Sequence, residues 1–169
     1  MKIAIIAAMD KNRGVGKENK IPWHITEDLV HLKNLTQDHV VILGRKTYES
    51  MSWYYDRSGR PMPAKLYIAV TRDVNYKPTR ENATAANSLE EALRKAEGVA
   101  DTEEVFINGG AQMFTEGITK ADRLYLTIVE GDYDVDTYFP DYSAFKTIIS
   151  EEEHVSKTGQ KYKFLTLEK

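Results

Sequence analysis

The sequence predicts an α/β fold built on a mainly parallel sheet. Segments with the pattern of buried strands alternate with segments that have the pattern of helices, and no internal repeat interrupts this order. The first of them, residues 2–8, is a nearly continuous apolar run, which is typical of a central strand covered on both faces. The last two apolar segments flank a turn at residues 157–160, which indicates an antiparallel pair at the edge of the sheet.

The remaining elements follow from the same patterns. We expect strands at residues 39–44, 65–71, 103–108, 122–130, 145–150 and 161–168. We expect helices at residues 26–36, with Thr26 as cap, and at 45–51, 88–98 and 111–118. Residues 50–64 are interpreted as a long surface loop, and the acidic run at 150–154 as a strand end or turn.

Length and composition limit the classes of function. The 169 residues suit one domain, 1–169, that is large enough to hold a core and a cleft. The absence of cysteine excludes disulfides and thiolate chemistry and fits a cytoplasmic location. A formal charge of −3 and a pI near 5.8 give no general attraction for nucleic acid. The N-terminal apolar run is too short to span a membrane and lacks the cleavage context of a signal peptide.

One acid of the first predicted helix, Asp28, lies on the apolar face of that helix. Because each residue advances about 100° around a helix, Ile25, Leu32 and Leu35 fall within roughly 60° of Asp28. Burial of an unpaired carboxylate costs several kcal/mol, more than the roughly 0.3 to 1 kcal/mol that the helix dipole returns. The dipole explains Glu27, which points elsewhere. Asp28 therefore has a buried partner or faces a cavity where a ligand needs it.

Three strand ends predict a rim that binds anions. Such ends meet at one edge of a parallel sheet, where helix N-termini offer N–H groups to phosphate. The residues concerned are Gly44, Arg45, Lys46 and Thr47, then Thr71 and Arg72, and finally Gly109 and Gly110. Together they indicate a nucleotide with several phosphates, although neither a G-x-G-x-x-G nor a Walker A sequence is present. The four histidines show no metal-ligand spacing, and no G-x-S-x-G elbow occurs.

In order along the chain, these segments resemble dihydrofolate reductase. The resemblance is carried by "IAAMDKNRGVGKENKIPWHITEDLVHLK", "VILGRKTYES", "GRPMPAK", "FINGGAQMF" and "LYLTIVEGDYDVDTYFPDY", and by the closing strand pair. It implies a mixed eight-stranded sheet with about four helices, NADPH as hydride donor and dihydrofolate as substrate. It also implies a monomer that makes tetrahydrofolate for one-carbon and thymidylate metabolism and binds antifolates.

The resemblance assigns roles to individual residues. Asp28 matches the family's buried acid in the pterin pocket, Thr127 the threonine that bridges this acid and the pterin amino group, and Trp23 a tryptophan that helps to hold a water. The further substrate-binding positions that it implies are Ala8, Leu29, Leu32, Arg60, Met62 and Lys65. The cofactor-binding positions are Ala8, Gly16, Ile21, Gly44, Arg45, Lys46, Thr47, Thr71, Arg72, Gly109, Gly110, Ala111, Gln112, Met113 and Phe114, and no metal is implied.

The chain departs from the family pattern at three positions. Asn108 stands where an aliphatic residue is usual, and Phe114 replaces a common tyrosine. Lys65 stands where the family has an arginine that grips the glutamate α-carboxylate of the substrate. The loop before Gly59 is longer than in compact bacterial members, and residues 10–24 resemble a mobile loop that closes over the nicotinamide.

Two other functions stay open. A pyrimidine reductase of riboflavin synthesis shares the NADPH fold, but it has no reason for an acid at Asp28 or a threonine at Thr127. A nucleotide-binding protein that has lost catalysis would have no need to keep this acid, this threonine and Trp23.

Overall fold

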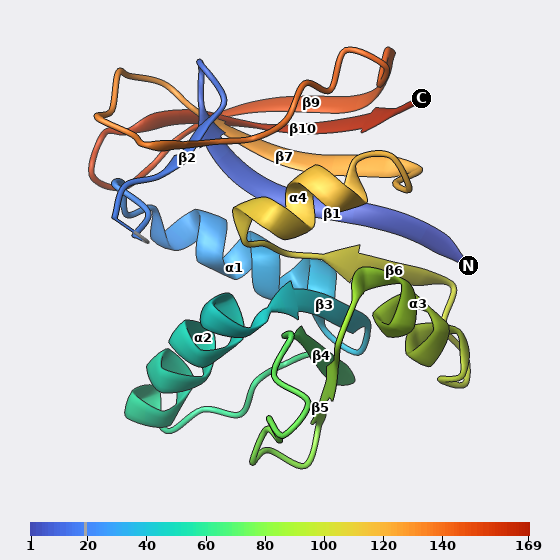
Figure 1. Ribbon diagram of the computed structural model, residues 1–169. Coiled ribbons are helices and arrows are strands. Elements are labelled where there is room, and N and C mark those ends of the chain that lie inside the picture. Colours follow the sequence, from blue (N-terminus) through green and yellow to red (C-terminus); the bar gives the residue numbers. More distant parts are fainter. Residues whose placement is uncertain (19) are drawn as a thin grey trace.

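A large twisted sheet forms the centre of the molecule (Figure 1). The computed structural model describes residues 1–18 and 20–169. The strand order is β5-β4-β3-β6-β1-β7-β10-β9, which runs from bottom to top in Figure 1. The strands are β1 (Lys2–Asp10), β3 (Val40–Gly44), β4 (Leu66–Val70), β5 (Ala83–Ala86), β6 (Glu104–Ile107), β7 (Arg123–Val129), β9 (Thr147–Val155) and β10 (Lys161–Glu168).

The directions of the strands match the prediction. β5, β4, β3, β6, β1 and β7 pair in parallel, whereas β10 is antiparallel to both β7 and β9. The predicted eight-stranded, mainly parallel sheet with an antiparallel C-terminal pair is therefore confirmed. All carboxyl ends of the parallel strands lie at one edge, where α/β proteins bind ligands.

Four helices cover the two faces of the sheet, as predicted. They are α1 (Thr26–Thr36), α2 (Arg45–Ser58), α3 (Leu89–Glu97) and α4 (Ala111–Gly117). The side chains of β1 alternate between two cores, because successive residues of a strand point to opposite faces. Ala4 and Ile6 pack with α1 and α2, while Ile5 and Ala7 pack with α3 and α4. The central strand is thus buried on both faces.

The predicted cap of α1 is wrong by one residue. Ile25 has extended backbone angles and occupies the N-cap position without a side-chain hydrogen bond, while Thr26 is already helical. The carbonyl of Ile25 accepts the first bond of the helix, from the N–H of Asp28 at 3.1 Å. Local main-chain geometry, rather than the hydroxyl of Thr26, therefore starts the helix.

The prediction that residues 50–64 form a surface loop is wrong over its first half. α2 continues to Ser58 and ends at Gly59, which has φ near +70°, a conformation that glycine adopts without strain. The guanidinium of Arg80 donates to Oγ of Ser52 at 2.9 Å and to its carbonyl at 3.1 Å. Arg80, which is distant in sequence, thus stabilises a part of α2 that the local sequence predicts only weakly.

Three strands were not predicted and one was predicted too short. β5 consists of alanines and a threonine, and β2 (Gly14–Gly16) pairs with β8 (Thr137–Tyr138) as a separate ribbon. β9 runs through the acidic residues to Val155 instead of ending at residue 150. All nine of its side chains are exposed, so carboxylates are tolerated while the main chain pairs with β10.

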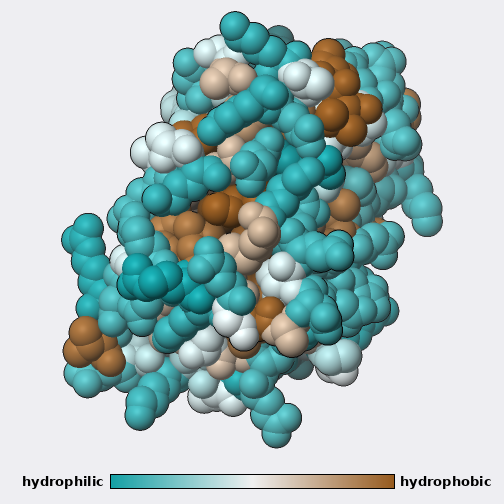
Figure 2. Space-filling view, turned by 90° about the vertical axis from the view of Figure 1, so that its right-hand side faces the viewer, coloured by the Kyte–Doolittle hydropathy of each residue, from teal (hydrophilic) through white to brown (hydrophobic). Residues whose placement is uncertain are grey.

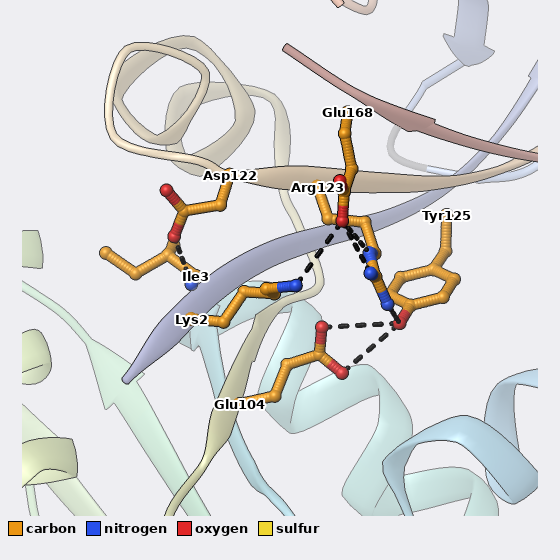
Figure 3. Close-up of polar contacts among 7 residues, drawn as sticks. All are labelled: Lys2, Ile3, Glu104, Asp122, Arg123, Tyr125 and Glu168. Carbon is orange, nitrogen blue, oxygen red and sulfur yellow. Dashed lines mark hydrogen bonds and ion pairs between the residues drawn. The ribbon is translucent and has the colours of Figure 1, made fainter. Parts of the chain in front are cut away.

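A polar network joins the strand ends at the opposite edge of the sheet (Figure 3). Glu168 accepts hydrogen bonds from Lys2 and Arg123, and Arg123 also donates to the hydroxyl of Tyr125 at 3.0 Å. That hydroxyl contacts the carboxylate of Glu104 at 3.2 Å. The first and last strands of the chain are thereby tied to the start of β7.

The surface on the side of the two termini is mainly hydrophilic, with apolar side chains gathered in separate patches (Figure 2). Among the helices of the described residues, none is long and apolar enough to cross a membrane.

Candidate active site

Two of the predicted anion-binding turns are in direct contact. β3 and β6 are neighbours, and the N–H of Gly44 donates to the carbonyl of Gly109 at 2.7 Å. One step earlier, the N–H of Asn108 donates to the carbonyl of Ile42 at 2.9 Å. Residues that are far apart in sequence therefore form one continuous rim.

The glycines of this rim bring its main-chain segments and Thr47 close together. A Cβ atom on Gly110 would lie 3.4 Å from Oγ1 of Thr47, and one on Gly44 would lie 3.5 Å from the nitrogen of Gly110. Gly109 has φ near +100°, and its peptide bond to Gly110 is cis. Neither α2 nor α4 has a side-chain cap, so the N–H groups that begin both helices are open to a ligand. This glycine-lined turn fits the close approach of a phosphate.

Three cationic side chains lie at the rim, but they are not equally available to bind an anion. Arg45 is paired with Glu49 at 2.6 Å and with Asp73 at 3.3 Å, which raises the pKa of its guanidinium. Within residues 1–18 and 20–169, Lys46 and Arg72 make no ion pair, and both are exposed. These two cations are therefore the ones ready to receive an anion.

The other predicted cofactor residues differ in exposure. Met113 and Phe114 are buried in the core beneath the glycine turn, and the Phe114 ring lies 3.5 Å from the position of a Cβ on Gly109. Ile21 and Gln112 are exposed. The partly buried members of the set are Ala8, Gly16, Thr71 and Ala111.

Asp28 has the partner that its position demands. Oγ1 of Thr127, on β7, donates a hydrogen bond to Oδ1 of Asp28 at 2.6 Å. Burial raises the pKa of the Asp28 carboxyl, and the bond from Thr127 offsets part of this effect. The bond engages one oxygen only, so Oδ2 remains available to a ligand that donates hydrogen bonds.

The apolar residues predicted to lie beside this acid differ in exposure. Trp23 is 9% exposed and meets the ring of Tyr133 edge-on at 5.1 Å. Met62 is buried and Leu32 packs partly buried against the same core. Leu29 is 41% exposed, so of the predicted pocket wall it offers the most free apolar surface to a ligand.

The two cations predicted to hold the end of the substrate have different surroundings. The ammonium of Lys65 donates to the carbonyl of Ala100 at 2.7 Å, in the segment after α3. Arg60 is exposed, and within residues 1–18 and 20–169 only its main-chain N–H is engaged, with Oγ of Ser58 at 3.3 Å. Lys65 is thus committed to a main-chain carbonyl, whereas the guanidinium of Arg60 is accessible.

The predicted mobile loop at residues 10–24 is fastened to the segment before β8. The N–H of Glu18 donates to Oδ2 of Asp136 at 3.0 Å, and the N–H of Asp136 donates to the carbonyl of Gly16 at 3.0 Å. Asn19, which belongs to this loop, lies outside the described residues. Asp136 therefore holds the end of β2 beside the start of β8, with one main-chain bond and one side-chain bond.

Sequence reasoning missed several residues that shape the site. Asp10 is 2% exposed and accepts the N–H groups of Asn12 and Gly14 at 2.9 and 2.8 Å. An aspartate that precedes an Asn-Arg-Gly turn signals this arrangement, because short acidic side chains bond to the backbone two residues on. No comparable signal marks Asp136 or Tyr133, whose partners are distant in sequence.

No group of three or more histidine, aspartate or glutamate residues in the described part of the chain could hold a metal ion. An open hollow of about 620 Å³ lies over the ends of β7, β9 and β10, and none of its lining residues is a predicted site residue. Its walls carry charges of both signs, from Lys11, Glu130, Glu153, Lys161 and Lys163. This mixture offers no selectivity for one sign of ligand.

Comparisons with known proteins agree with this geometry. Residues 2–169 match the family described as dihydrofolate reductase. The chain is 40% identical to dihydrofolate reductase type 3 of Salmonella typhimurium over 142 residues, which cover 84% of this chain and 80% of that protein. It is 38% identical to dihydrofolate reductase of Bacillus subtilis (strain 168) over 172 residues, with 99% and 94% covered.

A solved structure extends the agreement to three dimensions. Dihydrofolate reductase from Enterococcus faecalis, complexed with NADP(H) and RAB-propyl, superposes with a TM-score of 0.82 at 29% identity. The superposition covers 99% of this chain and 95% of the other. Since the match spans the buried acid, its threonine and the glycine rim alike, this chain belongs to the dihydrofolate reductase family.

Proposed function

We propose that Asp28, paired with Thr127, is the carboxylate that binds the pterin ring in this chain. The reaction follows from family membership: the chain reduces 7,8-dihydrofolate to 5,6,7,8-tetrahydrofolate with NADPH as cofactor. The observation that carries the assignment of Asp28 is its 2.6 Å hydrogen bond with Thr127, made where burial raises the pKa of the carboxyl. Bound NADPH supplies a hydride, so the protein must provide for the proton.

The pair suits the hydrogen-bonding edge of a pterin. A carboxylate accepts two parallel N–H bonds, here from the pterin 2-amino group and an adjacent ring nitrogen. Thr127 donates its only proton to Asp28, so its oxygen lone pairs can accept from the same amino group. A negative charge held at this edge favours protonation of N5 in the ring, which makes C6 a better hydride acceptor. Trp23, nearly buried, limits access of bulk water to this side of the pocket.

The rim is the proposed seat of the cofactor phosphates. Gly109 and Gly110 offer main-chain N–H groups and Thr47 offers a hydroxyl, a donor set that fits a pyrophosphate, while Gly44 packs beside them without a side chain. Lys46 and Arg72 would meet the additional phosphate that distinguishes NADPH from NADH. Apart from Lys65, whose ammonium is already engaged, the other positions assigned from the resemblance are proposed in the same roles.

A direct assay tests the function. Purified protein is mixed with NADPH and dihydrofolate, and the absorbance of the nicotinamide band is followed. We expect a decrease that requires both compounds. Binding of NADPH without any decrease would instead indicate a nucleotide-binding protein without this activity.

We further propose that the chain acts as a single-domain monomer in the cytoplasm. One continuous sheet contains strands from both ends of the sequence, which supports a single domain. The lack of cysteine and the requirement for NADPH suit the cytoplasm. Sedimentation equilibrium should give the mass of one 19.3 kDa chain, whereas twice that mass would contradict the monomer.

A further inference from the structure

A row of four side chains crosses the sheet beneath α1. The strand register places Ala8 beside Thr127, Thr127 beside Phe164, and Phe164 beside Glu152. Residues directly opposed on neighbouring strands point to the same face, with Cβ atoms roughly 4.5–5.5 Å apart. Thr127 is the member of this row that holds Asp28. Any residue that fixes the distance between α1 and this row also fixes that hydrogen bond.

His31 makes the second contact between α1 and the row. Its imidazole ring stacks on Phe164, with a centroid separation of 3.8 Å and an interplanar angle of 17°. His31 and Asp28 are three residues apart, so they are neighbours on one face of the helix. The helix therefore rests on two adjacent side chains of the sheet, Asp28 on Thr127 and His31 on Phe164.

The surroundings of His31 favour the neutral form of its imidazole ring. Burial lowers the pKa of its imidazole, Glu152 raises it in part, and His154 lowers it. The ring borders a groove of about 180 Å³, which Tyr125 also lines. A neutral imidazole can lie face to face with Phe164 without a counter-ion, as an aromatic spacer.

We propose that His31 is a positioning residue for Asp28: its ring, stacked on Phe164, sets the height of α1 above β7 at which Asp28 meets Thr127. The inference rests on the proposed role of Asp28. Loss of the spacer lets the helix settle closer to β10 and tilts the Asp28 carboxylate away from Thr127. The pterin then binds out of register with the hydride donor, so the chemical step suffers more than cofactor binding.

The test compares substitutions at His31 with one at a matched histidine. His31→Phe keeps an aromatic spacer, and His31→Ala removes it. The control is His39→Ala, because His39 also packs on a phenylalanine, edge-on to Phe106 at 5.3 Å, on the part of the sheet under the other end of α1. In single-turnover hydride transfer, we expect His31→Ala to be slower by about 10- to 100-fold, since a misplacement near 1 Å costs on that order. His31→Phe should stay within about threefold of the wild type, and His39→Ala within about twofold.

The dissociation constant for NADPH should remain unchanged in all three variants. If His31→Ala does not fold, His31→Gln replaces it, because the flexible side chain of glutamine can fill the space but cannot act as a rigid spacer, and a loss in the same direction is expected. A hydride rate within twofold of the wild type in the ringless variant, or an equal loss in His31→Phe, would overturn the positioning role. An inactive wild-type protein would instead refute the function on which this inference rests.

Discussion

The carboxyl group of Asp28 ionises in surroundings that oppose its charge, because burial raises its pKa above the usual value. Well below the unfolded pKa of about 3.9 the group is protonated in both the folded and the unfolded chain, so it contributes no difference. As the pH rises, the unfolded chain ionises first, and stability is lost until the pH has passed the folded pKa. Asp28 therefore lowers the stability of the folded protein at neutral pH.

Asp28→Asn should relieve this cost. At pH 7 the variant is expected to be more stable than the wild type, by about 1.4 kcal/mol for each pKa unit of the elevation. Urea unfolding at pH 7 and near pH 4 measures the difference, which should shrink at the lower pH. A variant less stable than the wild type at pH 7 would contradict the direction of the pKa shift.

The same substitution should remove most of the activity. Asparagine keeps the shape of Asp28 but cannot carry the charge that favours protonation of the pterin, so turnover should fall by about 10²- to 10⁴-fold. NADPH affinity, measured by fluorescence titration, should change less than twofold. Diaminopyrimidine antifolates, which carry a proton on the ring nitrogen when bound to a carboxylate, should also bind the variant far more weakly. Near-normal turnover would remove Asp28 from the mechanism.

The contacts of Arg60 and Lys65 predict that the two residues differ in their contribution to substrate binding. The ammonium of Lys65 is held by the carbonyl of Ala100, while the guanidinium of Arg60 is accessible. Arg60→Met should therefore raise KM for dihydrofolate by about 10-fold, the effect of losing one charged hydrogen bond, with kcat unchanged. Lys65→Met is expected to leave KM within about twofold. The reverse result in steady-state assays would show that Lys65 leaves Ala100 to grip the glutamate.

At the scale of elements, the ribbon of β2 and β8 depends on a buried glycine. A Cβ on Gly14 would lie 2.6 Å from a methyl carbon of Val135 and 2.7 Å from a carboxylate oxygen of Asp10. Gly14→Ala should cost about 1–3 kcal/mol through overpacking, or else expel the ribbon and expose the loop to protease. Gly98→Ala is the control, because its nearest neighbour would lie at 3.4 Å. Equal unfolding free energies and equal proteolysis for the two variants would refute this reading.

The elements predicted correctly are those whose signals are local. β1 was found because both of its faces are buried, and α3 because Ser88 caps it by accepting the N–H of Glu91. The second half of α2 was missed, since Arg80, which braces it, is 28 residues away from Ser52. β5 was missed because alanine-rich segments carry no apolar alternation.

The residues of the functional site, too, were predicted only where their signals are local. The position of Asp28 on an apolar stripe predicted a buried partner, but the stripe could not say which residue this is. Thr127 was reached only through the resemblance, because it lies 99 residues away. The stacking of His31 on Phe164 has no sequence signal, since cross-element contacts depend on strand register.

At the scale of the whole molecule, Glu168 fastens both ends of the chain (Figure 3). Hydrogen bonds from Arg123 and Lys2 lower the pKa of its carboxyl. Its contribution to stability is therefore complete above the unfolded pKa of about 4.3 and is lost as the pH falls through the lower folded pKa. Glu168→Gln should lower Tm at pH 7, and less so in high salt, because the pairs are partly exposed. A Tm difference that persists unchanged into strong acid would contradict the ionic origin.

The strand order also has a consequence for synthesis of the protein. β1 is made first, yet its two neighbours in the sheet, β6 and β7, begin at Glu104 and Arg123. On a ribosome this largely apolar strand therefore waits, without its two sheet neighbours, until most of the polypeptide has emerged, which is the kinetic burden of non-local pairing. Asp28 likewise gains its hydrogen bond only after Thr127 has been added. A ligand that needs both side chains can therefore bind only after Thr127 has been synthesised.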